Sequence, residues 1–363
     1  MMMSKNNNKT ERKNFRVSLF FAFLFSLMMS ACAGGGAPDP KIPPPTQLTL
    51  DEFIKSKNFS GVVLVRKDSV DILRQAYGFA DKAANRPNTL QTRFRIGSLT
   101  KAFTAVGIVQ LKQDGLITNY SDPVKKYLPA SPLNAQITIE QLLTHRSGIP
   151  DYLALDELDP ARTYTPLQLA ALFDTVPLDF TPGAKFEYSN SNYIMLGMLI
   201  ETLSGQPYFD YMQSSVFDSL GLAATEEGES NISGSEYAKG YTSPPQDTEA
   251  GFIDMSIPYA AGSVSSNLSD MQSWASSFED LSLISQQDYD AIFANAEYGF
   301  GWGTTPTQGL KTFWHTGGVS GFSSAIYLLP DDNGLIIILG NVEASDTQRA
   351  TQEIAQQILK TEF

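Results

Sequence analysis

Two patterns of hydrophobic and polar residues distinguish the ends of the chain from its middle. At the ends, short runs rich in β-branched and aromatic residues are bounded by turn residues, a pattern typical of strands. The runs at residues 59–66 and 70–78, separated by a turn at residues 67–69, predict a β-hairpin. Similar runs return near the other end, at residues 298–304, 311–315, 323–329 and 335–340. Helices are predicted at residues 49–57 and 347–360.

The middle of the chain has no strand-like alternation. Its pattern predicts short helices among loops, at residues 123–127, 138–143, 166–174, 192–203 and 208–214. We therefore expect an α/β (α+β) fold, in which an antiparallel sheet from both chain ends is flanked by helices and a mostly helical region is inserted. The expected sheet subdomain covers about residues 49–108 and 256–363, and the helical subdomain covers about residues 109–255.

The first 31 residues have the order of a secretory signal. A basic stretch that ends at Arg16 is followed by the uncharged run 17–31. A bilayer-crossing helix needs roughly 20 apolar residues, so this shorter run favours a signal peptide, with a membrane span as the alternative. The small residues before Cys32 resemble the lipobox of bacterial lipoproteins, in which the cysteine is lipidated and becomes the new N-terminus. An incidental cysteine is the other interpretation.

Residues 32–48 predict a lipidated cysteine followed by a flexible tether, because the segment is rich in glycine and proline and has no apolar periodicity. We therefore expect a lipid-anchored protein of the bacterial cell envelope, on the outer or the inner membrane. Its folded domain, residues 49–363, would face the periplasm or the exterior.

Composition and charge narrow the functional classes. The chain has 363 residues, of which 42% are hydrophobic and 18% charged, enough for a large core. Residues 1–31 hold five of the 26 basic and one of the 39 acidic residues, so the remainder holds 21 and 38, a charge of −17. Such a surface repels phosphate backbones, which argues against nucleic-acid binding.

Few residues are available for metal or thiol chemistry. The chain has one cysteine, Cys32, and two histidines, His145 and His315. This argues against a disulfide framework, a thiol nucleophile in the folded part and a Cys/His zinc site, and leaves a carboxylate-only metal site open. We expect no cofactor.

Ser98 and Lys101 are the first candidates for catalysis. Apolar residues after Ser98 follow helical spacing up to the stop signal Gly115, which places Ser98 at a helix N-terminus. There the backbone N–H groups can stabilise negative charge on an attached acyl oxygen. Lys101 lies one turn on, and a desolvated lysine can accept the proton of a serine hydroxyl. Alternatively, Ser98 only caps the helix and Lys101 is solvated.

Two further segments contain groups that suit acyl transfer. Tyr188 offers a phenol that can relay protons, and Asn190 offers an amide that can orient a substrate or a lysine. Residues 315–318 follow a strand-like run, and their two glycines permit a bound acyl group to approach a strand edge closely. Taken singly, both segments are weak signals.

Together, and in this order, the segments resemble the serine β-lactamase-like superfamily, which includes class C β-lactamases, D,D-peptidases, D-aminopeptidases and related serine esterases. The first motif matches Ser98 and Lys101, the second Tyr188 and Asn190, and the third residues 315–317. Supporting similarity lies at residues 142–150, 237–241, 261–263 and 298–302, and the match runs from about residue 50 to residue 363.

The resemblance implies a β-lactamase/transpeptidase-like fold and acyl transfer through a covalent ester on Ser98. It implies that Lys101 and Tyr188 share proton transfer, with the acylation base unassigned between them. The backbone N–H groups of Ser98 and Gly318 would form the oxyanion hole. The residues implied to bind or orient the substrate are Asn190, His315, Thr316, Gly317 and Gly318.

One residue departs from the β-lactamase pattern. His315 stands where β-lactamases and many penicillin-binding enzymes have a lysine that holds the substrate carboxylate. A neutral imidazole binds a carboxylate less well, so the departure favours the esterase and aminopeptidase branches. His145 and Arg146 are interpreted as structural residues.

The sequence thus predicts a serine hydrolase for ester or peptide-like amide bonds of a small-molecule or peptide-like acyl substrate. A D,D-carboxypeptidase, a weak β-lactamase and a non-catalytic penicillin- or peptidoglycan-binding lipoprotein remain alternatives. So does a serine triad built on His315, whereas the G-x-S-x-G elbow of α/β-hydrolases is missing from the chain. The oligomeric state stays open.

Overall fold

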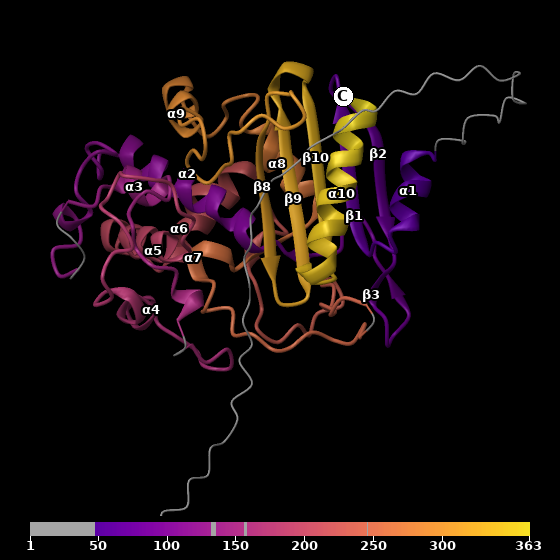
Figure 1. The fold of residues 1–363 in the computed structure, drawn as a ribbon, viewed down its shortest axis with the longest axis horizontal. Helices are drawn as coiled ribbons and strands as arrows, with labels where there is room; N and C mark the ends of the chain where they lie inside the picture. The colour runs from indigo at the N-terminus through magenta and orange to yellow at the C-terminus, as the bar shows by residue number, and fades with distance from the viewer. Residues whose placement is uncertain (1–47, 132–135, 156–157, 245) are drawn as a thin grey trace, which may run out of the picture. The chain divides into compact units, whose positions relative to one another are not determined.

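Five strands from the two ends of the chain form one antiparallel sheet in the computed structural model (Figure 1), which describes residues 48–131, 136–155, 158–244 and 246–363. The strand order is β2-β1-β10-β9-β8. This arrangement confirms the predicted fold class and the predicted pairing of the two chain ends. The strands are β1 (Gly61–Lys67), β2 (Val70–Tyr77), β8 (Phe313–Val319), β9 (Phe322–Leu329) and β10 (Gly334–Gly340).

The centre of the sheet is covered on both faces. Strand β10 pairs with β1, with Leu64 opposite Ile337, and every residue of β10 is buried. Because side chains alternate along a strand, one set packs with helix α8 (Leu268–Ser276) and the other with helix α10 (Ala344–Glu362). Helix α1 (Leu50–Ser56) lies on the same face as α10 (Figure 1). Burial on both faces explains why these strands read as continuous apolar runs.

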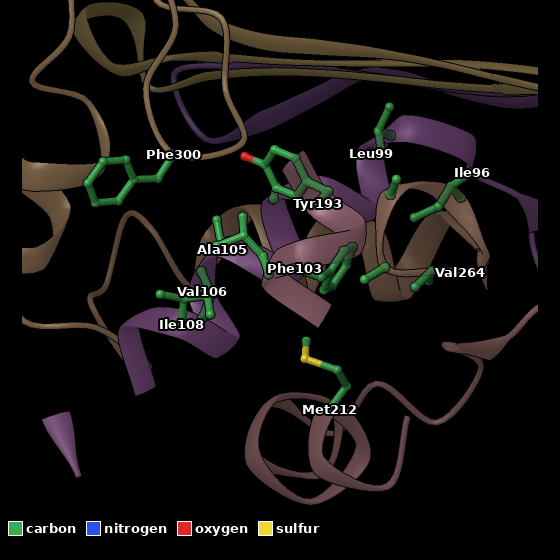
Figure 2. Packing of buried hydrophobic residues seen from close by; sticks show 14 of the residues in the cluster. Ile96, Leu99, Phe103, Ala105, Val106, Ile108, Tyr193, Met212, Val264 and Phe300 are labelled. Carbon is green, nitrogen blue, oxygen red and sulfur yellow. The ribbon is translucent and has the colours of Figure 1, made fainter. Parts of the chain in front are cut away.

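The helical part surrounds helix α2 (Thr100–Gln113), which is buried from Thr100 to Val109. Figure 2 shows the α2 side chains Phe103 and Val106 inside this packing. Gly107 lets helix α6 approach, because a Cβ at this position would lie 2.9 Å from the Met212 sulfur. The other helices of the described residues are α3 (Ile139–Leu143), α4 (Pro166–Phe173), α5 (Ser191–Ser204), α6 (Tyr208–Met212), α7 (Tyr259–Gly262) and α9 (Gln286–Ile292).

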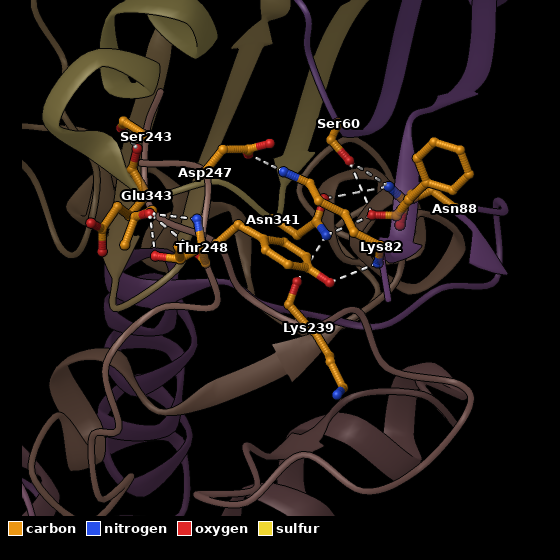
Figure 3. A network of polar contacts seen from close by, with 12 residues as sticks. Ser60, Lys82, Asn88, Lys239, Ser243, Asp247, Thr248, Asn341 and Glu343 are labelled. Carbon is orange, nitrogen blue, oxygen red and sulfur yellow. Dashed lines mark hydrogen bonds and ion pairs between the residues drawn. The ribbon is translucent and has the colours of Figure 1, made fainter. Parts of the chain in front are cut away.

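A polar network joins the sheet to the chain around residues 239–248 (Figure 3). The Asn341 side-chain nitrogen donates to the backbone oxygens of Phe79, at 2.9 Å, and Lys239, at 2.8 Å. The backbone N–H of Asn341 donates to the Ser60 oxygen at 3.1 Å. The Asn88 side chain donates to the Ser60 hydroxyl and the Tyr77 carbonyl. These bonds hold the ends of β1, β2 and β10 together.

Some local predictions are wrong. Residues 298–304 form isolated bridges instead of a strand, because the chain turns back on itself at Gly301, with φ +79°, and Gly299 bonds to Trp302. Residues 123–127 contain a single 3-10 turn, Val124–Lys126. Five short strands escaped prediction because they are only two or three residues long: β3 (Phe79–Asp81), β4 (Arg86–Pro87), β5 (Phe94–Arg95), β6 (Glu226–Glu227) and β7 (Val264–Ser266).

Other predictions lie beyond what the structure tests. The signal peptide, Cys32 and nearly all of the tether fall outside the described residues. Within the described part of the chain, no helix has both the length and the apolarity required to cross a bilayer. The boundary expected near residue 108 falls inside the continuous helix α2, and the division into two subdomains stays a prediction.

Candidate active site

Ser98 lies in a 3-10 turn, Gly97–Leu99, directly before helix α2. Gly97 adopts φ +53°, a left-handed conformation that favours glycine, and a Cβ there would come 2.7 Å from the backbone nitrogen of Gly318. Gly317 is similarly constrained, because its Cβ would lie 2.1 Å from the Ile96 oxygen. The two glycines therefore allow the Ser98 turn to lie directly against strand β8.

Strand β8 presents a free edge at this point. It is the last strand in the sheet order. On its inner side it pairs with β9, with Gly318 opposite Ser323 and Gly317 opposite Ser324. The Ser324 hydroxyl donates to the Ile96 oxygen at 2.8 Å, which ties β9 to the residues before Ser98. The geometry thus places the Gly318 amide beside the Ser98 turn, as the predicted oxyanion hole requires.

Lys101 is fully buried and makes three polar contacts. Its Nζ lies 3.0 Å from the Ser98 Oγ, 2.8 Å from the Asn190 Oδ1 and 2.7 Å from the Ala261 carbonyl oxygen. A neutral amine has two hydrogens and one lone pair. The oxygens of Asn190 and Ala261 only accept hydrogen bonds, so they take the two hydrogens and leave the lone pair facing the Ser98 hydroxyl.

Burial changes the proton affinity of this amine. Desolvation lowers the pKa of Lys101 from 10.5 to about 7, and the negative charge of Asp151 opposes this fall. At neutral pH roughly half of the molecules therefore carry Lys101 as a free amine. A solvated lysine would be almost entirely protonated, so the alternative of a surface Lys101 does not describe this structure.

Tyr188 lies over the same amine. The Lys101 Nζ is 4.9 Å from the centre of the Tyr188 ring. Burial raises the pKa of Tyr188, although a hydrogen bond with Ser98 partly lowers it again. The phenol consequently stays protonated at neutral pH and meets the serine hydroxyl. The structure therefore brings Ser98, Lys101, Tyr188 and Asn190 together from two separate segments.

His315 is bonded to partners other than Ser98. Its Nδ1–H donates to the Thr316 carbonyl at 2.6 Å, and its Nε2 accepts from the Tyr298 hydroxyl at 2.8 Å. Burial, together with the nearby charge of Lys101, lowers the pKa of His315 to about 3. The ring is therefore neutral, and both of its nitrogens are occupied. This geometry does not support a triad in which His315 activates a serine.

His145 supports the tyrosine from behind. Its Nδ1 accepts from the Ser189 N–H at 3.2 Å and from the Asn192 side-chain nitrogen at 3.1 Å. Its ring centre lies 4.2 Å from that of Tyr188, and burial holds its pKa well below the usual range. Neighbouring Arg146 pairs with Glu297 at 3.0 Å. These contacts agree with the structural interpretation of both residues.

Three groups of the site escaped the sequence analysis as participants. The Ala261 carbonyl binds Lys101, the Tyr298 hydroxyl binds His315, and the Asp151 carboxylate accepts from the Asn190 side-chain nitrogen at 2.9 Å. A backbone carbonyl leaves no side-chain signal. Tyr298 lies in a segment of family similarity and Asp151 directly follows another, but no pattern there reveals their partners.

The described residues also contain a polar cavity of about 200 Å³ near the end of β8. Arg95, Lys239, Phe252 and Ser320 are among the residues that line it. No three His, Cys, Asp or Glu side chains of the described residues gather closely enough to hold a metal ion.

Comparison with protein families gives one match over most of the chain. The model of the β-lactamase family matches residues 47–359. This match confirms the resemblance that the ordered motifs predict.

Individual relatives and solved structures agree with the family match. Penicillin-binding protein 4* of Bacillus subtilis is 28% identical over 340 residues, which cover 86% of this chain and 75% of the relative. A D-stereospecific amidohydrolase from Streptomyces sp. has a TM-score of 0.70 and 26% identity, over 82% of this chain and 94% of its own. D-amino acid amidase from Ochrobactrum anthropi shares the fold, with a TM-score of 0.75, 24% identity and coverage of 86% and 99%.

Proposed function

The chain belongs to the β-lactamase family, and from this premise we propose that it is a serine acyl hydrolase that cleaves ester or peptide-like amide bonds through a covalent ester on Ser98. The observation that carries the proposal is the contact of Ser98 with Lys101. The hydroxyl lies 3.0 Å from a fully buried amine whose pKa is lowered to about 7. A base with a pKa near the working pH is well suited to proton transfer.

The first step is acylation. The Lys101 lone pair takes the hydroxyl proton of Ser98 while Oγ bonds to the substrate carbonyl carbon, and the carbonyl electron pair moves onto its oxygen. The N–H groups of Ser98 and Gly318 receive that oxyanion. As it collapses, the bond to the leaving group breaks, and the protonated phenol of Tyr188 donates a proton to the leaving amine or alkoxide. Tyr188 regains its proton from Lys101.

Deacylation reverses these roles with water as the nucleophile. Lys101 is again a free amine after the first step, and it takes a proton from a water that attacks the ester carbon. As the bond to the acyl group breaks, the Ser98 oxygen takes this proton from Lys101 and leaves as a hydroxyl. Asn190 and the Ala261 carbonyl keep the amine in place throughout, because neither partner exchanges protons at neutral pH.

The third segment favours neutral groups in the substrate. His315 is uncharged and bonded to Tyr298 and Thr316, so no permanent cation stands at this position to neutralise a carboxylate. Relatives named as a D-stereospecific amidohydrolase and a D-amino acid amidase support an amide substrate. D,D-carboxypeptidase activity or weak β-lactamase activity is the second candidate, supported by relatives named as penicillin-binding proteins.

The experiment is intact-protein mass spectrometry after incubation with a fluorophosphonate, a p-nitrophenyl ester or a β-lactam. We expect an adduct on Ser98 that is absent from Ser98→Ala and present in the control Ser320→Ala, which loses a hydroxyl near the end of β8. An adduct that persists in Ser98→Ala contradicts the proposal. An ester adduct that forms but is never released identifies the non-catalytic binding protein instead.

The proposed place of action is the bacterial cell envelope, with the domain tethered through a lipid on Cys32. The support is the signal-like order of residues 1–31 and the small residues before the lone cysteine. Expression of the full chain in a bacterial host with an alkyne-labelled fatty acid should label it and place it in the detergent phase. The control Cys32→Ala should lose both properties. Equal labelling of the two proteins contradicts the anchor.

A further inference from the structure

We propose that Asp151 is a positioning residue of this site, whose carboxylate fixes the orientation of the Asn190 amide and so aims its oxygen at the Lys101 amine. This inference rests on the proposed function and adds a residue to its machinery. Asp151 touches none of the reacting atoms described above. It acts on them through Asn190 and through its charge.

The orientation of Asn190 follows from what its two neighbours can exchange. The Asn190 Nδ2 donates to the Asp151 Oδ2 at 2.9 Å, and the Asn190 Oδ1 accepts from Lys101 at 2.8 Å. An ionised carboxylate only accepts hydrogen bonds, so the amide nitrogen must face Asp151. If the amide turned over, its nitrogen would point donors at the Lys101 hydrogens and its oxygen would face the carboxylate. Both contacts would then be lost.

Asp151 is itself held firmly in place. It precedes the turn Tyr152–Ala154, and its Oδ1 accepts from the Leu153 N–H at 3.2 Å, while the backbone N–H of Asn190 provides another bond to the carboxylate. The Tyr152 N–H donates to the Ser191 hydroxyl at 2.9 Å, and this hydroxyl donates to the Pro150 oxygen at 2.6 Å. The loop and the start of helix α5 are therefore bound to each other on both sides of the carboxylate.

Asp151 is also the charged group that acts on the amine. The other titratable side chains that face Lys101 are Tyr188 and Tyr193, whose rings lie 4.9 and 5.5 Å from its Nζ, and the histidines His145 and His315. Burial keeps all four neutral at pH 7. Removal of the Asp151 charge would therefore leave the desolvation of Lys101 unopposed and lower its pKa further.

The test compares Asp151→Asn with the wild type and with the control Asp159→Asn. Asp159 is an exposed residue of the same connecting segment, and its side chain accepts from the Ala161 N–H. kcat/KM for a p-nitrophenyl ester is measured from pH 5 to pH 9. We expect Asp151→Asn to lose about tenfold at pH 8 and to move the midpoint of the acidic limb to lower pH. Asp159→Asn should follow the wild-type curve.

Two further variants separate positioning from folding. Asp151→Ser removes the charge but keeps an acceptor for the Leu153 N–H, so it should fold and still shift the acidic limb. In an Asn190→Ala background, Asp151→Asn should have no more than a small additional effect on kcat/KM at pH 8, because the residue that it positions is missing and its charge acts only on the acidic limb. Melting temperatures of all variants verify folding.

The outcomes are distinct. A uniform loss of kcat/KM with an unmoved acidic limb in both Asp151 variants overturns the inference, since a purely structural role gives that result. A full tenfold effect of Asp151→Asn in the Asn190→Ala background overturns it as well. If the wild type forms no Ser98 adduct with the ester, the proposed function has failed, and that result is read from the wild type alone.

Discussion

Two buried polar networks in this molecule are built from similar groups but serve different purposes. Around Asn341, side-chain amides meet backbone carbonyls and a serine hydroxyl, and every hydrogen-bonding group of Asn341 has a partner (Figure 3). Around Lys101, a titratable amine is buried with two acceptors and one hydroxyl. The first network has no proton to move at neutral pH. The second contains a base whose pKa burial has brought to about 7.

The difference shows how the same interior serves stability and chemistry. The neutral hydrogen bonds around Asn341 stabilise one arrangement of the chain. A buried amine lowers the free energy of unfolding at pH values below the pKa that it has in the unfolded chain. The reason is that water stabilises its charged form better than the protein interior does. This unfavourable burial favours the proposed chemistry, because it lowers the pKa of Lys101 and so raises the fraction of free amine beside Ser98. The following predictions test this contrast, from the largest expected effect to the smallest.

Removal of the amine should have the largest effect. Lys101→Met keeps the length of the side chain and removes the base, so kcat/KM for a p-nitrophenyl ester should fall by about 10³-fold or more. Steady-state kinetics measure this loss. Lys125→Met, a change at an exposed position, is the control and should remain fully active. An active Lys101→Met enzyme would break the comparison.

Stability should report the same amine. The pKa of Lys101 is lower in the folded state than its usual 10.5, so the unfolded chain binds the extra proton between about pH 7 and pH 10.5. The free energy of unfolding of the wild type should therefore rise relative to Lys101→Met by about 1.4 kcal/mol per pH unit across this window. Urea titrations at pH 7, 8 and 9 measure the difference. Parallel curves for the two proteins would contradict a buried amine with a lowered pKa.

The pH dependence of turnover gives the next effect. Because the free amine is the active form, kcat/KM should rise about tenfold per pH unit below pH 7 and level off above it. Neither histidine should contribute a limb between pH 5 and pH 8, since burial lowers the pKa of both. An acidic limb that survives unchanged in a His315→Gln variant is the expected control result.

The Asn341 network should respond in the opposite way. Asn341→Leu leaves the carbonyls of Phe79 and Lys239 without their donor, which should cost about 2–3 kcal/mol of unfolding free energy. Chemical denaturation measures this loss. The midpoint of the acidic limb of kcat/KM should stay where it is in the wild type. A shifted midpoint would show that the two networks are coupled.

A cation at residue 315 should have the smallest effect on activity. His315→Lys brings a second positive charge near Lys101 and supplies a partner for a substrate carboxylate. The ratio of β-lactam acylation to neutral ester hydrolysis should rise about three- to tenfold, measured by competition for Ser98 in mass spectrometry. His315→Gln is the uncharged control. An unchanged ratio in the lysine variant would mean that this position does not face the substrate carboxylate.

The sequence predicts those parts of the fold whose cause is local. The central strands β1, β9 and β10 follow from apolar runs buried on both faces, and helix α2 follows from the spacing after Ser98. The strand expected at residues 298–304 fails because a glycine turn and a bridge to Trp314 decide its shape, and both depend on distant residues. Strands of two residues are too short to leave any periodic signal.

The site divides in the same manner. Ser98, Lys101, Tyr188 and Asn190 stand in short motifs and were found, and the structure adds their distances. The Ala261 carbonyl is invisible because any residue type carries one. Asp151 escaped prediction, because nothing in its local pattern shows that its partner Asn190 lies 39 residues further along the chain.

The contacts of Lys101 also restrict the routes by which a proton can reach or leave its amine. Two of its three neighbours are an amide oxygen and a backbone oxygen, which do not accept a proton at neutral pH. The helix that carries it is buried from Thr100 to Val109, so no exposed helix face lies beside the amine. We therefore expect a proton to leave the amine by the route on which it arrived, past the Ser98 hydroxyl and the Tyr188 phenol. In the proposed mechanism, a proton that Lys101 takes from Ser98 or from water therefore passes by way of Tyr188 to the leaving group or back to Ser98, and the site recovers its starting protonation in every cycle.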